Sequence, residues 1–231
     1  MGSCSTLSLL ASTRDSNGES KAVNRSKPIA SRTKADLTKG RFVKSKSKAG
    51  QRSIKTKVIP QIVVNSNYIR YDTIESLDQN AQVILVGTPL KDFLDRKHVV
   101  THFSDGTRQD FYTLTEIKIE KIIKQPDSLV LNLSQTLEVI EPITVIDEGK
   151  SGKVKLARDN YLELRRGSRY ILFLKKGLGV DNYFVINRNL GKFNLDGTDV
   201  DDLGEEDKPV LRKEKLNFKK DVLKKYGDKL K

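Results

Sequence analysis

Residues 108–124 read RQDFYTLTEIKIEKIIK, and their pattern sets the class of fold. Apolar and polar side chains alternate, with Ile117 and Ile119 on one side and Glu116 and Lys118 on the other. A period of two is typical of a β-strand that has one buried face and one solvated face. The stretch is therefore predicted to be a long strand of a β-sheet.

The neighbouring segments extend this pattern. KHVVTHF (97–103) comes before the long strand, and SDGT (104–107) lies between them, which predicts a hairpin with Asp105 and Gly106 at its turn. Other short β-branched runs are AQVILVG (81–87), LVLNL (129–133), TLEVIEPITVI (136–146), RYILFLKK (169–176), NYFVIN (182–187) and GKFNL (191–195). Several short strands separated by turn residues predict a mainly β protein built as a small antiparallel barrel or a sandwich, and we expect the barrel.

Two of these runs, 81–87 and 169–176, are apolar at consecutive positions. In the second run, Tyr170 and Leu172 share one face of the strand, whereas Ile171 and Phe173 share the other. Both runs are therefore predicted to be barrel-wall strands with both faces covered. A shorter apolar run, 62–64, is expected to add one more strand.

Two helices are predicted at the ends of the strand-rich region. Asp72 followed by Glu75 is typical of an N-cap with a capping box, so a short N-terminal helix is expected there. Near the C-terminus, Asn217 is the expected cap of an amphipathic helix with apolar residues at helical spacing, namely Phe218, Val222, Leu223 and Tyr226. Its lysine-rich remainder leaves three placements open: the helix packs on the barrel, lies on a membrane or frays.

The formal net charge of +13 is distributed unevenly. Residues 1–57 carry a net charge of +11, residues 58–207 a net charge of −5 and residues 208–231 a net charge of +7. Residues 1–57 have little to bury and are predicted to be a disordered basic tether. The expected division is this tether, a β-barrel domain at 58–197, and an acidic loop with a basic C-terminal helix at 198–231.

The basic segments and the barrel predict different partners. Solvated Lys and Arg attract polyanions of any kind, so the expected partner of the tails is an anionic membrane surface or another polyanion. The barrel is expected to bind an unidentified protein or small ligand.

Residues that carry chemistry are sparse. His98 and His102 are the only histidines, and on a strand their spacing separates them by about 13 Å, which is too far to share one metal ion. The acidic run from Asp196 to Asp207 lacks the EF-hand order and is expected to be a solvated loop. GKSGK (149–153) lacks the P-loop spacing and is expected to be a hairpin turn. We predict no catalytic residues, no metal and no cofactor, and hence no enzyme.

The start of the chain, MGSCSTLSLL, carries the candidate lipidation sites. Gly2 and Thr6 satisfy the Met-Gly-x-x-x-Ser/Thr pattern of N-myristoylation. Cys4 is placed for a second acyl chain or, if the true start lies upstream, for a bacterial lipobox. We expect lipid on Cys4, with Gly2 as the alternative, and a membrane-associated protein outside the cytoplasm, with the cytoplasm as the alternative location.

A soluble binder of single-stranded nucleic acid is the alternative function. Aromatic residues of the barrel segment would offer stacking faces, namely Phe111, Tyr112, Tyr170, Phe173, Tyr183, Phe184 and Phe193. The net negative charge of that segment and the apolar surroundings of these residues argue against it.

The runs ESLDQNAQVILVGTPL, YTLTEIKIEKIIK, RRGSRYILFLKK and GKFNL together resemble bacterial extracytoplasmic proteins of largely unknown function. Their barrel is similar to the OB-like fold of netrin-like domains and tissue inhibitors of metalloproteinases. The likeness covers about residues 70–197 and rests on Gly87, Gly167, Tyr170, Phe173, Leu174 and Phe193. Those inhibitors use an N-terminal Cys on a disulfide-pinned barrel, whereas Cys4 stands far before the barrel and has no cysteine partner. The inhibitor activity is therefore not carried over. The resemblance implies an OB-like fold and a location outside the cytoplasm, where lipoproteins of this kind typically have a lipidated Cys followed by a polar tether.

Overall fold

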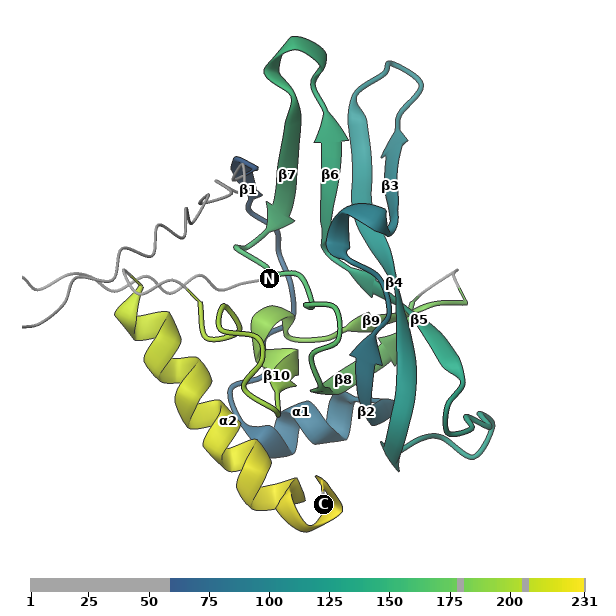
Figure 1. Ribbon diagram of the computed structural model, residues 1–231, viewed down its shortest axis with the longest axis vertical. Coiled ribbons are helices and arrows are strands. Elements are labelled where there is room, and N and C mark those ends of the chain that lie inside the picture. The colour runs from purple at the N-terminus through teal and green to yellow at the C-terminus, as the bar shows by residue number, and fades with distance from the viewer. Residues whose placement is uncertain (1–58, 178–180, 205–207, 231) are drawn as a thin grey trace, which may run out of the picture. The chain divides into compact units, whose positions relative to one another are not determined.

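The computed structural model describes residues 59–177, 181–204 and 208–230, which fall within one compact unit (Figure 1). Gly2, Cys4 and the predicted tether 1–57 lie outside the described residues. The helices and strands follow one another as β1 (Gln61–Val64), α1 (Ile74–Asn80), β2 (Val83–Pro89), β3 (Lys97–His102), β4 (Arg108–Lys124), β5 (Thr136–Glu141), β6 (Ile143–Asp147), β7 (Lys153–Arg158), β8 (Tyr170–Lys176), β9 (Tyr183–Val185), β10 (Lys192–Asn194) and α2 (Pro209–Leu230). Short 3-10 helices cover Phe93–Asp95, Gly149–Ser151 and Arg188–Gly191.

Five strands close into a barrel, which confirms the predicted fold class at this level. β2 pairs with β4 and β8, β4 pairs with β5, and β9 completes the ring between β5 and β8. The pairing is antiparallel except between β5 and β9, which run parallel. Outside the ring, β10 pairs with β8 and β3 pairs with β4.

The long strand β4 has the two faces that its sequence predicts. Ile117 and Ile119 are buried, whereas Lys118 and Glu120 are exposed. The predicted hairpin is also present, because β3 pairs with β4 across a turn in which Gly106 has a φ of +83°. The Asp105 carboxylate accepts a hydrogen bond from the Thr107 amide at 2.8 Å and so closes the turn.

A second sheet contains β1, β7 and β6, with β1 parallel to β7 at one edge. β6 and β7 form a hairpin that extends from the barrel beside the β3–β4 hairpin (Figure 1). Strand β1 confirms the added strand expected at 62–64, and GKSGK lies in the β6–β7 turn as predicted. Strand β7 was not predicted, although Val154 and Leu156 alternate with lysines and are buried in it.

Two apolar clusters cover the two faces of the barrel wall. The inner cluster includes Val83, Leu85, Ile117, Ile119, Val139, Tyr170 and Leu172. The outer cluster joins the wall to both helices and includes Ile74, Leu77, Ile84, Ile171, Phe173, Phe193, Phe218, Val222 and Tyr226. Strands β2 and β8 contribute to both clusters, as their consecutive apolar residues predict. Phe218, Val222 and Tyr226 of α2 are buried in the outer cluster, so α2 packs on the barrel through its apolar side. Each fully buried apolar side chain contributes about 1.5–3 kcal/mol to the stability of the fold.

The helix starts and one strand differ from the sequence prediction. Helix α2 begins at Pro209, whose missing N–H suits the first turn, so Asn217 lies inside the helix and is no cap. Helix α1 is capped by Thr73, which accepts a hydrogen bond from the Ser76 amide, and not by Asp72. Residues 129–133 form no strand, and Leu129 and Leu131 instead pack against the inner cluster from the β4–β5 loop.

Candidate functional site

His98 and His102 do not form a common site in the structure. His98 is half-buried on β3, its Nδ1 lies 2.9 Å from the Thr113 hydroxyl, and burial lowers its pKa. His102 is exposed at the end of the same strand. Within the described ranges, no group of three or more His, Cys, Asp or Glu residues is placed to hold a metal ion.

Most aromatic residues proposed as stacking faces are part of the core. The buried ones are Phe111, Tyr170, Phe173, Tyr183 and Phe193, whereas Tyr112 and Phe184 are partly exposed. A ring must expose its face to stack on a nucleobase. The buried rings are therefore not available for stacking in this conformation.

The acidic run is only partly a solvated loop, which corrects the sequence expectation. Asp199 and Asp202 are buried, and their carboxylates accept hydrogen bonds from the Tyr170 hydroxyl at 2.5 Å and from Lys215 Nζ at 2.7 Å. A buried carboxylate requires such partners, because desolvation without them is costly. These two contacts hold the acidic run against the barrel and against α2.

A cleft of about 110 Å³ lies beside β1, between the segment after β9, the acidic loop and the start of α2. Its apolar surface comes from Tyr68, Leu162, Leu190, Leu203 and Leu211. Its cationic residues are Arg70, Arg188, Lys208, Arg212 and Lys215, and its acidic residues are Asp159, Asp202 and Glu214. The lining is thus amphipathic with an excess of positive charge. We refer to it as the basic cleft.

The backbone is distorted where Arg188 enters the basic cleft. Asn187 and Arg188 have left-handed φ angles of +59° and +53°, which cost about 1 kcal/mol or more each for residues other than glycine. The Asn187 side chain offsets part of this cost, because its Oδ1 accepts from the Tyr71 amide at 3.1 Å and its Nδ2 donates to the Tyr71 carbonyl at 2.7 Å. This pair of bonds fixes the segment between β1 and α1 to the segment after β9.

The resulting position of Arg188 leaves its charge only partly compensated. The guanidinium lies 4.9 Å from the centre of the Tyr68 ring, and its Nη2 donates to the Ser66 hydroxyl at 2.9 Å. Its Nε is buried, makes no hydrogen bond within the described part of the chain and lies 3.4 Å from the Asp159 carboxylate. Burial lowers the pKa of Arg188, because desolvation opposes the charged form more than Asp159 favours it.

A buried ion pair holds the opposite wall of the basic cleft. The side chains of Lys215 and Asp202 are only 4% and 1% exposed, and the second Asp202 oxygen accepts from the Asn194 amide at 3.0 Å. Burial lowers the pKa of Lys215 to about 8, although Asp202 acts in the opposite direction. Behind the pair, the buried Nζ of Lys192 lies 5.1 Å from the centre of the Tyr161 ring and has no hydrogen-bond partner among the described residues.

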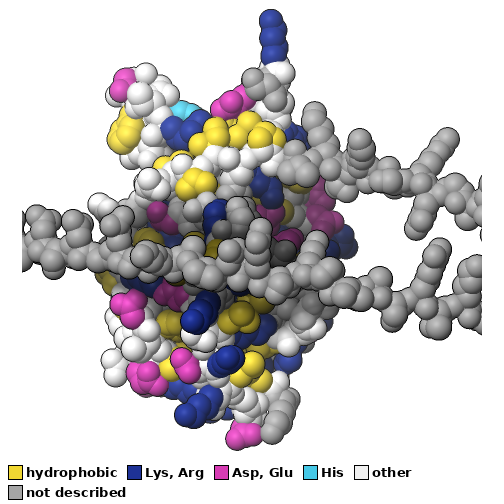
Figure 2. Space-filling view, turned by 90° about the vertical axis from the view of Figure 1, so that its left-hand side faces the viewer, with side chains coloured by type: hydrophobic (Ala, Val, Ile, Leu, Met, Phe, Trp, Pro, Cys, Tyr) yellow, Lys and Arg dark blue, Asp and Glu magenta, His cyan; other side chains and the backbone are white. Residues whose placement is uncertain are grey.

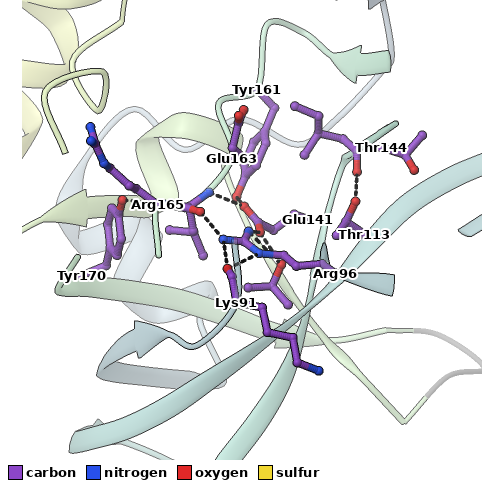
Figure 3. Close-up of polar contacts among 12 residues, drawn as sticks. Lys91, Arg96, Thr113, Glu141, Thr144, Tyr161, Glu163, Arg165 and Tyr170 are labelled. Atoms are coloured by element: carbon purple, nitrogen blue, oxygen red, sulfur yellow. Dashed lines mark hydrogen bonds and ion pairs between the residues drawn. The ribbon is translucent and has the colours of Figure 1, made fainter. Parts of the chain in front are cut away.

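The third wall depends on a polar network inside the fold (Figure 3). Glu141, at the end of β5, is fully buried and accepts from Arg96 Nη1 at 2.7 Å, from the Thr115 hydroxyl and from the Tyr161 hydroxyl at 3.2 Å. Its Oε2 also accepts from the Leu164 amide at 2.8 Å. The network thereby anchors the segment from 159 to 164, which supplies Asp159 and Leu162 to the cleft wall.

Arg96 completes the same network from the other side. Its side chain is 1% exposed, and its remaining nitrogens donate to the Lys91 carbonyl at 3.0 Å and to the Leu164 carbonyl at 2.5 Å. Burial and the adjacent Glu141 charge raise the pKa of Tyr161, so its hydroxyl stays protonated and donates to Glu141. Every member has a partner, which is typical of a buried network that orders a core.

These contacts pre-form the basic cleft and suit it to binding. Three fixed walls reduce the ordering cost that a ligand must overcome. None of its described lining residues is His, Cys, Ser or Thr. The residues that line the basic cleft are far apart in sequence, so little in the local sequence indicates this site. One local indication is Asn187 just after strand β9, because Asn tolerates the left-handed backbone of a sharp turn.

No protein-family model and no curated protein matches this sequence. None of the helices in the described residues combines the length and apolar character that crossing a bilayer requires.

Proposed function

We propose that this protein is a noncatalytic binding module, in which an OB-like barrel is held at a membrane outside the cytoplasm by lipid on Cys4. The basic cleft is its ligand site. The observation that carries this proposal is the set of three polar contacts that fix the cleft walls, namely the part-buried contact of Asn187 with Tyr71 and the buried pairs of Lys215 with Asp202 and Arg96 with Glu141.

The strand order supports the OB-like part of the proposal. The ring strands in chain order are β2, β4, β5, β8 and β9. The first pairs with the second and the fourth, and the third pairs in parallel with the fifth. This Greek-key order with one parallel pair is the arrangement expected of a five-stranded OB barrel.

The distribution of charge supports membrane association. Residues 1–57 carry a net charge of +11, and on α2 the side chains of Lys213, Lys220 and Lys224 are exposed. Each Lys or Arg near an anionic leaflet contributes about 1 kcal/mol, and a single acyl chain binds only marginally. Lipid on Cys4 and these basic residues would therefore act together.

Mass spectrometry of the N-terminal peptide from the native host tests the anchor. We expect an acyl or diacylglyceryl mass on Cys4 and a protein that sediments with membranes. Cys4→Ser should move the protein to the soluble fraction, and Gly2→Ala should not. An unmodified Cys4 in a soluble wild-type protein would overturn the anchor, and a soluble Gly2→Ala protein would assign the lipid to Gly2 instead.

Amide NMR of the full chain tests the ligand site. The probes are citrate, inorganic phosphate and a glutamate-rich decapeptide, each titrated to about millimolar concentration. At least one is expected to shift the amides of Arg188, Leu211 and Arg212 while the amides of the β3–β4 turn stay in place. Titrations that leave all three cleft amides unchanged would refute a ligand site in the basic cleft.

A further inference from the structure

Strand β1 presents an open edge. Among the described residues it pairs only with β7, and the carbonyls of Pro60 and Val64 accept hydrogen bonds from β7 and the residue after it, at 2.8 and 3.1 Å. Alternate residues of a strand direct their backbone groups to opposite edges. The N–H and C=O groups of Gln61 and Val63 therefore point away from β7, and the described part of the chain gives them no hydrogen-bond partner.

Within its four residues, this edge lacks three of the devices that commonly protect a sheet. Exposed edge strands are commonly blunted by charged side chains, a proline or a bulge. β1 reads QIVV, without charge and without proline, and its pairing with β7 has no register shift. Ile62 and Val63 are 47% and 41% exposed, and hydrophobic side chains gather on the upper part of the face that carries β1 (Figure 2). Such an edge is suited to pairing with another extended segment.

The basic cleft borders this edge, because Gln61 is one of its lining residues. Arg212 lines the cleft and is only partly exposed, and in the described part of the chain its side chain joins no hydrogen bond or ion pair. Arg188 is partly desolvated, and among the described residues its buried Nε–H has no hydrogen-bond acceptor, with the Asp159 carboxylate 3.4 Å away. Two guanidinium groups in the lining of one cleft favour a carboxylate.

We propose that an extended acidic peptide adds to β1 as a further strand and places its carboxylates in the basic cleft, against Arg212 and Arg188. The inference rests on the proposed ligand site and names its ligand class. Main-chain hydrogen bonds to Gln61 and Val63 supply affinity, and the alternate side chains that face the cleft supply specificity. A second copy of this chain does not fit, because QIVV brings no carboxylate and two cationic clefts would repel each other.

Val63→Pro is a selective probe of this edge. The Val63 N–H points away from β7, so proline removes the donor offered to a peptide without breaking the β1–β7 ladder. Val63→Ala is the matched control, because it shortens the same side chain and keeps the N–H. The full chain is applied to an array of decapeptides in which Val, Ile and Thr alternate with Asp and Glu, with Lys and Arg, or with Ser.

We expect the acidic set to be retained at least about tenfold more strongly than the basic set, which corresponds to about 1.4 kcal/mol. Val63→Pro should reduce that binding about tenfold or more, and Val63→Ala should change it less than about threefold. Arg212→Glu should also reduce binding to the acidic set. Thermal melting of each variant confirms that it is folded.

Backbone methylation of the best acidic peptide tests the same edge on the wild-type protein. Methyl groups on the amides that face β1 should abolish binding, and methyl groups on the opposite amides should not. Equal binding by Val63→Pro and Val63→Ala, equal effects of the two methylation patterns, or no preference for acidic peptides would each overturn strand addition. If acidic peptides still bind Val63→Pro but are lost in Arg212→Glu, strand addition is refuted while the ligand site in the cleft stands.

Discussion

At the scale of single residues, buried charges fix the walls of the basic cleft, and their removal should be costly. Glu141→Gln keeps the shape of the side chain but leaves the Arg96 guanidinium buried without a counter-charge. We expect the free energy of unfolding to fall by about 3 kcal/mol in urea titrations. Asp92→Asn is the control, because it breaks the exposed pair with Arg166 and should cost less than about 1 kcal/mol. Similar losses for the two variants would contradict a structural role for the network.

A second buried charge predicts an effect of pH. Burial lowers the pKa of Lys215 from 10.5 to about 8 in the folded protein. Between pH 8 and 10.5 the unfolded chain therefore binds more protons than the native state, so stability should rise with pH in this window and show no such slope below it. Above pH 10 the raised pKa of Tyr170 acts in the opposite direction, because tyrosines of the unfolded chain then ionise first.

Urea midpoints measured from pH 7 to 9.5 test this effect. The free energy of unfolding of the wild type should rise by up to about 1.4 kcal/mol per pH unit above pH 8. The double variant Lys215→Met with Asp202→Asn removes both charges and should lose the rise. A rise of equal slope in the double variant would assign it to another group.

At the scale of elements, strands with a long and regular pattern of apolar residues were predicted correctly, whereas a strand with a shorter pattern and the start of a helix were not. Strand β4 was predictable because Ile117 and Ile119 alternate with charged residues over a long run, and β8 because both of its faces are apolar. Strand β7 was missed although Val154 and Leu156 alternate with lysines, since GKSGK drew the segment into a turn. The start of α2 was predicted too late, at Asn217, because Asn217 looks like a capping residue from its local sequence. The preceding turns of the helix are held by a tertiary contact, that of Lys215 with Asp202, which the local sequence does not show.

The tight segment between β9 and β10 depends on a glycine. A Cβ at Gly191 would lie 1.7 Å from the carbonyl oxygen of Ile186, which is backbone and cannot rotate away. Gly191→Ala should therefore lower the free energy of unfolding by about 2–3 kcal/mol. Gly227→Ala is the matched control inside α2, where a Cβ meets nothing within 4 Å, and should raise stability by about 0.5–1 kcal/mol. Thermal melting of both variants measures these changes in stability. An unchanged stability of Gly191→Ala would contradict the close approach of residue 191 to the Ile186 carbonyl.

At the scale of the whole molecule, the barrel was within reach of sequence reasoning and the basic cleft was not. The period-two strands are typical of a small barrel or a sandwich, whereas the cleft is lined by residues near 61–70, 159–162, 187–190 and 202–215. These segments meet because β1 runs parallel to β7 and α2 returns to the barrel. The prediction of a solvated acidic loop was also partly wrong. Asp199 and Asp202 are buried, Asp199 beside Tyr170 and Asp202 beside Lys215.

The charge distribution of the whole chain leads to a final prediction. The exposed Lys220 and Lys224 of α2 lie on a helix whose apolar side is already used by the barrel, so α2 can attract an anionic surface only through charge. The Cys4→Ser full chain lacks the anchor and is expected in the soluble fraction at physiological ionic strength. At low ionic strength, where charge is least screened, it should sediment with vesicles of phosphatidylcholine and phosphatidylglycerol, and not with phosphatidylcholine alone. Binding should be lost near 0.5 M salt, where screening shortens electrostatic attraction to a few ångströms.

Charge reversal separates the two basic regions. Lys220→Glu with Lys224→Glu should weaken vesicle binding by about 2 kcal/mol or more, at about 1 kcal/mol for each removed cation near the surface. Lys155→Glu is the control, since Lys155 lies on β7, pairs with Glu163 and is not part of α2. If the α2 variant binds as well as the wild type, the attraction comes from residues 1–57, whose net charge is +11, and α2 serves only to cover the barrel.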